Sequence, residues 1–232
     1  MTKGRDSFIH IVETIADNKF VLGDRLVEIG VGGPNLEASL SSIAMAQGEL
    51  GHARLLYNWA FDLKGLTGKK QDVRDQTGKA FRFAGNTTDW IGLIASAYTI
   101  NVSFNLVLQA MFEAGHTDIV MRIHKLLREQ GDHVAYCRGW AVQLANDTGA
   151  VPRKFREALQ ERVAEARAWL VKLEADQELF CKRLHESGHG VDRPVRSNDR
   201  GGRGAQDGGP WLTGKRDAPN RSAASANPRT SR

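Results

Sequence analysis

The sequence predicts an all-α protein, and three observations support this prediction. Apolar residues recur with the period of a helix, no segment alternates apolar and polar residues as a strand does, and glycine or proline separates the amphipathic segments. The chain has 232 residues, of which 41% are hydrophobic and 25% are charged. This composition can bury a core, so a wholly disordered chain is excluded.

The first two predicted helices are joined by a tight turn. An apolar stripe from Phe8 to Ile29 marks the first helix, and the glycines and proline of residues 30–34 end it. The second helix is predicted over residues 36–63, with Gly65 as its stop. Its expected apolar members are Leu36, Leu40, Ile43, Ala44, Leu50, Leu55 and Trp59.

Three more helices follow a longer connection. Residues 66–88 form this connection, which has room for a short helical turn, and Asp89 flanks the start of the third helix. A tight connection at residues 116–118 leads into the fourth helix. Pro152 is well placed at the start of a fifth helix, since its missing N–H costs nothing there, and Gly188 is expected to end that helix.

One segment is long enough to be tested as a membrane span. Residues 90–111 carry no charge and are roughly sufficient to cross a bilayer. Asn101, Asn105 and Gln109 would nevertheless place an amide stripe along a helix here. A central helix buried by neighbouring helices fits this pattern better, so we expect no membrane partner.

The order of the segments describes a ferritin-like four-helix bundle with a fifth helix packed alongside. Two tight connections and one longer crossover join the four long helices. We expect this helical domain to span residues 1–193. Residues 194–232 are rich in Gly, Arg, Ser, Asn, Asp and Pro and are predicted to be a disordered tail.

The net charge of +5 comes from the tail. Residues 193–232 hold nine Lys or Arg and three Asp, whereas residues 1–192 hold 23 basic and 24 acidic groups. No basic groove is therefore expected on the domain, and nucleic acid is not the expected partner. The single Arg-Gly-Gly-Arg-Gly segment at 200–204 leaves RNA binding as a third, weaker hypothesis.

The sequence favours a cytoplasmic location. The N-terminal residues run into amphipathic sequence with no apolar signal segment. Cys137 and Cys181 are far apart and match no CxxC or zinc spacing, which fits a reduced compartment.

A candidate metal site begins with Glu49 and His52. Glu-x-x-His places a carboxylate and an imidazole on one helix face, which is the ligand pair that di-iron bundles use. Gly51 and Ala53 are small neighbours that would allow another helix to approach. The alternative is a surface glutamate and a hydrogen-bonded core histidine.

The height of each residue along the bundle indicates its partners. Residues equidistant from a tight antiparallel turn lie at the same level, so Glu49 faces residues 17–21. Asp17 and Asp24 bracket this region, so a partner carboxylate is available.

The second half of a di-iron site is chemically incomplete. His133 is expected to lie level with Asn101, and Gln130 stands where Glu-x-x-His requires a carboxylate. Glu129 is one position away, rotated by about 100°. Neutral amides are weak iron ligands and cannot offset two metal charges in a core. We expect His133 to pair with Glu129 or Asp132 rather than to ligate iron.

These motifs together resemble a known family. The segments 17–18, 22–26, 34–37, 48–54 and 138–140 are similar in residues, order and spacing to the phenylacetic acid catabolic family. Within that family the similarity is greatest to the structural subunit of bacterial phenylacetyl-CoA 1,2-epoxidase. The resemblance covers roughly residues 7–193 and implies a ferritin-like fold.

The resemblance also implies a function and a partner. In the family a catalytic subunit carries a di-iron centre and forms an epoxide on the ring of phenylacetyl-CoA with dioxygen. A homologous structural subunit without a working metal site supports it. We therefore expect a non-catalytic subunit whose partner is a homologous catalytic oxygenase subunit.

The resemblance marks positions for a vestigial or partial metal site. Carried over by position, the ligands are Asp24, Glu49, His52 and His133. Asn101 and Gln130 fall where the catalytic homologue has carboxylates, so no cofactor is expected. Retention of Glu49 and His52 departs from the structural subunit and leaves iron at a partial site as an alternative. The corresponding enzyme hypothesis is an iron-dependent oxidase in which Glu129 completes the site.

Overall fold

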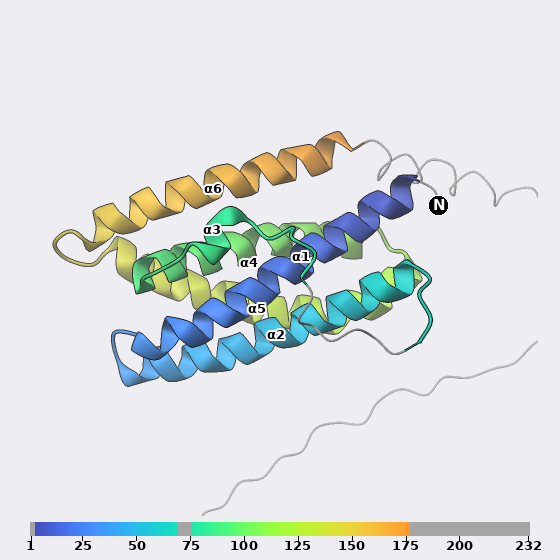
Figure 1. The fold of residues 1–232 in the computed structure, drawn as a ribbon. Coiled ribbons are helices and arrows are strands. Elements are labelled where there is room, and N and C mark those ends of the chain that lie inside the picture. The colour runs from blue at the N-terminus through green and yellow to red at the C-terminus, as the bar shows by residue number, and fades with distance from the viewer. Residues whose placement is uncertain (1–2, 69–75, 177–232) are drawn as a thin grey trace, which may run out of the picture. The chain divides into compact units, whose positions relative to one another are not determined.

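The computed structural model describes residues 3–68 and 76–176, and every regular element within these ranges is helical. The elements are α1 (Lys3–Glu28), the 3-10 turn η1 (Gly30–Gly32), α2 (Leu36–Leu63), α3 (Arg82–Gly85), α4 (Trp90–Glu113), α5 (Thr117–Ala145) and α6 (Val151–Ala175). Long helices α1, α2, α4 and α5 form the bundle, and α6 lies along α4 (Figure 1). The predicted all-α, ferritin-like architecture with a fifth helix is confirmed.

The α1–α2 hairpin follows its predicted boundaries. Asn35 caps α2 by accepting a hydrogen bond from the Ala38 N–H at 2.8 Å. Gly30 lies so close to α2 that a Cβ there would stand 1.8 Å from Ser42 Oγ. Gly65, just past the end of α2, has a φ of 70°, which glycine adopts at little cost. The hairpin ends are therefore fixed by local residues.

Helix α4 is the central helix of the bundle. Asp89 caps it by accepting a hydrogen bond from the Gly92 N–H at 2.7 Å. In the described part of the chain, α4 is the one helix with the length and composition of a membrane span, and 67% of its most apolar window is buried inside the protein. It contacts α1, α5 and α6. Its apolar character is thus accounted for by packing within the bundle.

The expected apolar face of α2 is partly wrong. Leu36, Leu40 and Leu55 are more than half exposed, and Ile43 is 36% exposed. The buried face of α2 instead carries small and polar residues together with larger ones, namely Ala38, Ser42, Met45, Ala46, Glu49, His52, Ala53, Leu56, Trp59 and Ala60. Because polar residues occupy part of the buried face of α2, some of its leucines lie on the solvent-exposed face.

The C-terminal predictions are only partly covered by the structure. Pro152 lies in the first turn of α6, as predicted. Helix α6 ends at Ala175, ahead of the predicted end at Gly188. Gly188, Cys181 and the predicted tail at 194–232 lie outside the described residues.

Candidate functional site

The centre of the bundle holds a buried lysine. On α1, the residues Val12, Ile15, Lys19, Leu22 and Leu26 follow the three- and four-residue spacing of one helix face. All five are between 0 and 1% exposed, and Lys19 is the largest fully buried side chain of the described residues. A lysine is almost never fully buried unless it is paired, so its partners are decisive.

The partner of Lys19 is Glu49. Lys19 Nζ lies 2.7 Å from Glu49 Oε2, and both side chains are 0% exposed. The other carboxylate oxygen, Oε1, accepts a hydrogen bond from His133 Nδ1 at 2.8 Å. Burial alone would raise the pKa of Glu49, but Lys19 and then His133 more than offset it and hold this pKa well below its ordinary value. Glu49 is therefore a carboxylate, and its contacts join α1, α2 and α5.

A glycine makes the contact with His133 possible. A Cβ on Gly48 would stand 2.6 Å from His133 Nε2, closer than side chains are found. Only glycine therefore lets α2 pass this close to the imidazole. Gly51, which the sequence suggested for this purpose, has open space around its Cβ position. Close approach depends on which side of the helix a residue lies, and the Cβ position of Gly48 faces α5.

His52 forms the second polar contact between α2 and α5. Its Nε2 donates to Glu129 Oε2 at 2.9 Å, and its ring stacks on that of His133 with centroids 4.9 Å apart. Burial, and then the nearby Lys19 ammonium, lower the pKa of His52 to about 4. His52 is therefore neutral at pH 7. Its other nitrogen, Nδ1, is buried and has no hydrogen-bond partner among the described residues.

Two buried amides complete this level of the bundle. Gln130 Nε2 donates to Asn101 Oδ1 at 2.7 Å and to the Asn101 carbonyl at 3.0 Å. Lys19 Nζ also lies 3.4 Å from Asn101 Oδ1. Both amide side chains are 0% exposed. Asn101 Nδ2 also lies 3.9 Å from Cys137 Sγ. Asn101 therefore contacts α5 residues on both sides of His133, as the predicted shared level requires.

The structure brings together three of the four predicted site residues. Glu49, His52 and His133 can each offer one ligand atom, and these atoms lie within 4.8 Å of one another. Asp24 does not join them: its side chain is 59% exposed and pairs with Arg25. The reason is the helical phase, since five residues at about 100° each place Asp24 about 140° around α1 from Lys19.

Asp17 and the expected partners of His133 also differ from the prediction. Asp17 is fully buried but binds Tyr57, Thr77 and Lys79, which anchors the connection after α2.

His133 pairs with Glu49 rather than with Glu129 or Asp132, and Glu129 pairs with His52. The polar pairs exist, but they run between helices instead of along α5.

The sequence reasoning missed Lys19, although a signal was present. Lys19 lies in the region predicted to face Glu49, and it occupies a position within the apolar stripe of α1. A charged residue on the buried face of an amphipathic helix indicates a buried partner. Because only carboxylates were considered as partners of Glu49, the cation Lys19 was missed.

The donor set does not fit a pair of iron ions. Two irons need several anionic ligands around them. Among the described residues at this level, two carboxylates are fully buried: Lys19 already neutralises Glu49, and Tyr57, Thr77 and Lys79 already engage Asp17. Glu129 is 37% exposed at the edge, and Asn101 and Gln130 are neutral. The residues could hold at most a partial site, and only if Lys19 gave way.

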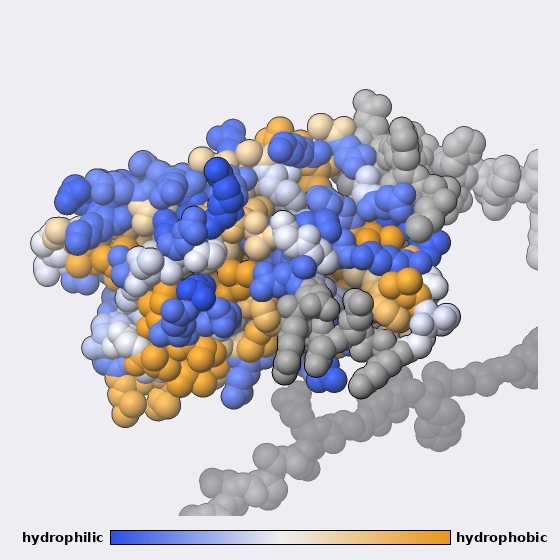
Figure 2. Space-filling view, in the orientation of Figure 1, coloured by the Kyte–Doolittle hydropathy of each residue, from blue (hydrophilic) through white to orange (hydrophobic). Residues whose placement is uncertain are grey.

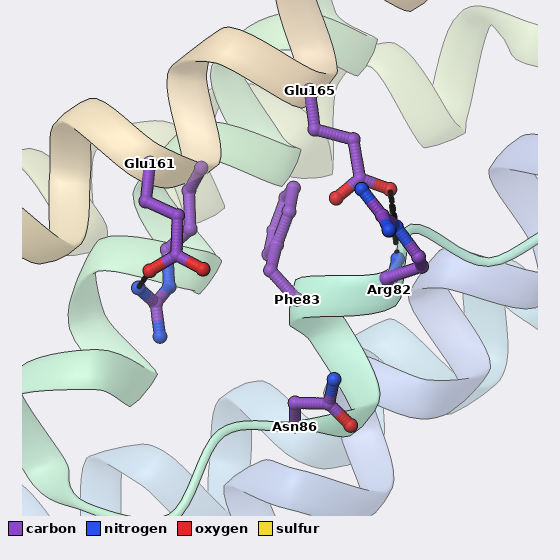
Figure 3. A pocket seen from close by; sticks show the side chains of 6 residues that line it. Arg82, Phe83, Asn86, Glu161 and Glu165 are labelled. Atoms are coloured by element: carbon purple, nitrogen blue, oxygen red, sulfur yellow. Dashed lines mark hydrogen bonds and ion pairs between the residues drawn. The ribbon is translucent and has the colours of Figure 1, made fainter.

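A second polar feature lies elsewhere, between α3 and α6. A hollow of about 270 Å³ is lined by Arg82, Phe83, Asn86, Glu161, Arg162 and Glu165 (Figure 3). Glu165 accepts a hydrogen bond from the Arg82 N–H at 2.9 Å, and Arg162 Nε donates to Ser96 Oγ at 2.8 Å. These contacts hold α3 and α4 against α6. The hollow shares no residue with the cluster around Glu49.

Comparison with known proteins identifies the family. A family model described as phenylacetic acid catabolic protein matches residues 1–193. No curated protein gives a match to the chain. Since the matched region includes every helix of the bundle, the chain belongs to the phenylacetic acid catabolic protein family and is a protein of phenylacetate catabolism.

Proposed function

We propose that this chain is a non-catalytic structural subunit of a phenylacetyl-CoA oxygenase, the ring 1,2-epoxidase, and that it supports a homologous di-iron catalytic subunit in the cytoplasm. Membership of the family and the motifs that resemble its structural subunit support this role. The partner is identified from that resemblance.

The buried ion pair of Lys19 and Glu49 carries the proposal. A di-iron centre would place several positive charges where the Lys19 ammonium already lies, 2.7 Å from the carboxylate. Charges this close repel strongly in an interior of low dielectric constant. The pair and the bond from His133 instead link three helices, so the bundle holds together without a metal ion. This arrangement suits a subunit that keeps the family's shape and leaves the chemistry to its partner.

An exposed apolar surface supports the existence of a partner. Leu36, Leu40 and Ile43 lie along one face of α2 at spacings of four and three residues, and we call them the α2 patch. Val31 in the preceding turn is 55% exposed. Figure 2 shows hydrophobic surface over this end of the hairpin, at its lower left. Contiguous apolar surface of this kind is typical of interaction sites.

Helix α5 carries a separate exposed hollow in the same half of the bundle. A hollow of about 470 Å³ is lined by Gly131, Val134, Ala135, Arg138, Gly139 and Val142. Ser41 of α2 hydrogen-bonds to Tyr136 of α5 at 3.3 Å, so this half of α5 packs against the half of α2 that also carries, on another face, the α2 patch. Small residues at its floor would let a partner helix approach closely. We propose that the catalytic subunit contacts the α2 patch, and that the hollow on α5 is a further surface for a partner helix.

The partner contact predicts the effect of a single substitution. Leu40→Asp puts a charge into the apolar contact, so we expect it to weaken binding to the co-expressed catalytic homologue by about 2 kcal/mol or more, roughly 30-fold. Co-purification and a binding titration measure this. Leu106→Asp on α4 is the matched control, because Leu106 is 53% and Leu40 59% exposed. Equal loss for both variants, or no loss for Leu40→Asp, contradicts the contact.

Metal analysis tests the role itself. We expect the purified full chain to hold iron at well below one ion per chain and to show no oxygenase activity alone, because Lys19 opposes a metal ion beside Glu49. Elemental analysis and a turnover assay with phenylacetyl-CoA check both. Two bound irons per chain would overturn the proposal.

An iron-dependent oxidase is the second candidate function. The nearness of Glu49, His52 and His133, and the bond of Glu129 to His52, favour it. In that case His52→Ala abolishes an activity of the isolated chain, whereas the structural role predicts a change in stability alone.

A further inference from the structure

The buried carboxylate of Glu49 has its counter-cation built into the chain. Glu49 is 0% exposed, and its two oxygens are engaged by Lys19 Nζ and His133 Nδ1. A buried carboxylate without a cation or proton is strongly unfavourable. Whatever occupies the position of the Lys19 ammonium must therefore be positive, or the carboxylate must take up a proton.

We infer that the Lys19 ammonium stands in for a metal ion, and that a neutral residue at position 19 turns Glu49, His52 and His133 into a site for one divalent cation. This inference rests on the proposed non-catalytic role, since it treats the natural chain as excluding metal. It differs from that role in assigning the exclusion to one residue.

The ligand atoms are already close to a binding arrangement. Those of Glu49, His52 and His133 lie within 4.8 Å of one another. Around one zinc-like ion, with bonds of about 2.1 Å, ligand atoms are separated by about 3.4 Å. Side-chain rotations that shift each atom by roughly 1 Å close this difference. One carboxylate and two imidazoles are a donor set that Zn²⁺ and Co²⁺ accept.

An unsatisfied atom points independently to a missing ligand. His52 Nδ1 is buried, on a side chain that is 2% exposed, and has no hydrogen-bond partner within the part of the chain that the structure describes. Buried polar atoms without partners are rare, and a nitrogen lone pair of a neutral imidazole is a metal ligand. His133 is 12% and Glu129 37% exposed, which leaves a route for an ion from solvent.

The experiment uses the full chain carrying Lys19→Gln, since glutamine is neutral and can still hydrogen-bond to Glu49. Co²⁺ is titrated while visible absorption is recorded, because tetrahedral cobalt with nitrogen and oxygen ligands has characteristic bands. We expect one Co²⁺ per chain, bound at least about 100-fold more tightly than by the natural chain. Zn²⁺ should raise the Tm of the variant and not that of the natural chain.

The double variant Lys19→Gln/Glu49→Gln is the matched control, and it should lose the added cobalt binding. A folded Lys19→Gln chain that binds Co²⁺ no better than the natural chain overturns the inference, as does a double variant that binds equally well. If Lys19→Gln is unfolded without metal, the chain is refolded with Zn²⁺ and its helical circular dichroism is recorded. Recovery of the helical signal supports the inference, and its absence overturns the inference. Two irons in the natural chain would instead overturn the proposed function.

Discussion

Lys19→Met is expected to lower the free energy of unfolding by about 3–5 kcal/mol at pH 7, because it removes one partner of a buried ion pair. Methionine fills most of the volume of the lysine stem but leaves the Glu49 carboxylate without its ammonium, at 0% exposure. Denaturant unfolding followed by circular dichroism measures the loss. A second change, Glu49→Gln, should restore much of it, since the uncompensated charge is then absent.

The loss should depend on pH in a defined direction. In the natural chain Lys19 and His133 outweigh burial and keep the pKa of Glu49 low in the folded state. The stabilisation they give is therefore fully present when the pH is above the pKa of this glutamate in the unfolded chain, and it is lost as the pH falls through the lower pKa of the folded state. Without Lys19, burial dominates and raises this pKa. The difference between the two chains should therefore shrink as the pH falls below about 5. A constant difference from pH 7 to pH 4, or no recovery in the double variant, would show that the charge of Glu49 is not the cause.

Asp17→Ala is expected to destabilise the protein by about 3–5 kcal/mol, because it leaves several buried donors without an acceptor. Asp17 accepts hydrogen bonds from Tyr57 OH at 2.5 Å, from Thr77 N and Oγ1 at 3.0 and 2.8 Å, and from the Lys79 N–H at 2.7 Å. The loss should be concentrated where the chain returns to the bundle after α2. Amide hydrogen exchange at Thr77 and Lys79 reports this directly.

Asp24→Ala provides the control on the same helix. Asp24 is 59% exposed, and its ion pair among the described residues is with the neighbouring Arg25. This substitution should therefore change stability by no more than about 0.5 kcal/mol. If the two alanine variants were equally stable, the anchoring role of Asp17 would be wrong.

Helix boundaries were predictable because the signals that set them are local. Asn35 and Asp89 cap α2 and α4 with their own side chains, and Gly65 ends α2 with a positive φ. Each of these residues acts on atoms a few positions away in the chain. The apolar face of α2 was less predictable, because its exposed leucines look the same in sequence as buried ones.

The candidate site was predictable in level but not in pairing. Counting from the turns placed Glu49 opposite residues 17–21 and His133 opposite Asn101. The distance from a turn does not say which side chain of a facing helix points inward. Asp24 therefore counted as an available partner and Lys19 was overlooked, although the helical phase in the packed bundle turns Lys19 inward and Asp24 outward.

The helices, their order and the amides at Asn101 and Gln130 follow from the amino-acid order alone, and with them the lack of the carboxylates that a di-iron pair requires. The packed bundle was needed to establish that Lys19 meets Glu49, that His133 takes the second oxygen and that Glu129 reaches His52. The physical reason is range, because capping and periodicity act within a few residues of one helix. The charge balance of a buried site depends on which side chains three separate helices bring to the same place.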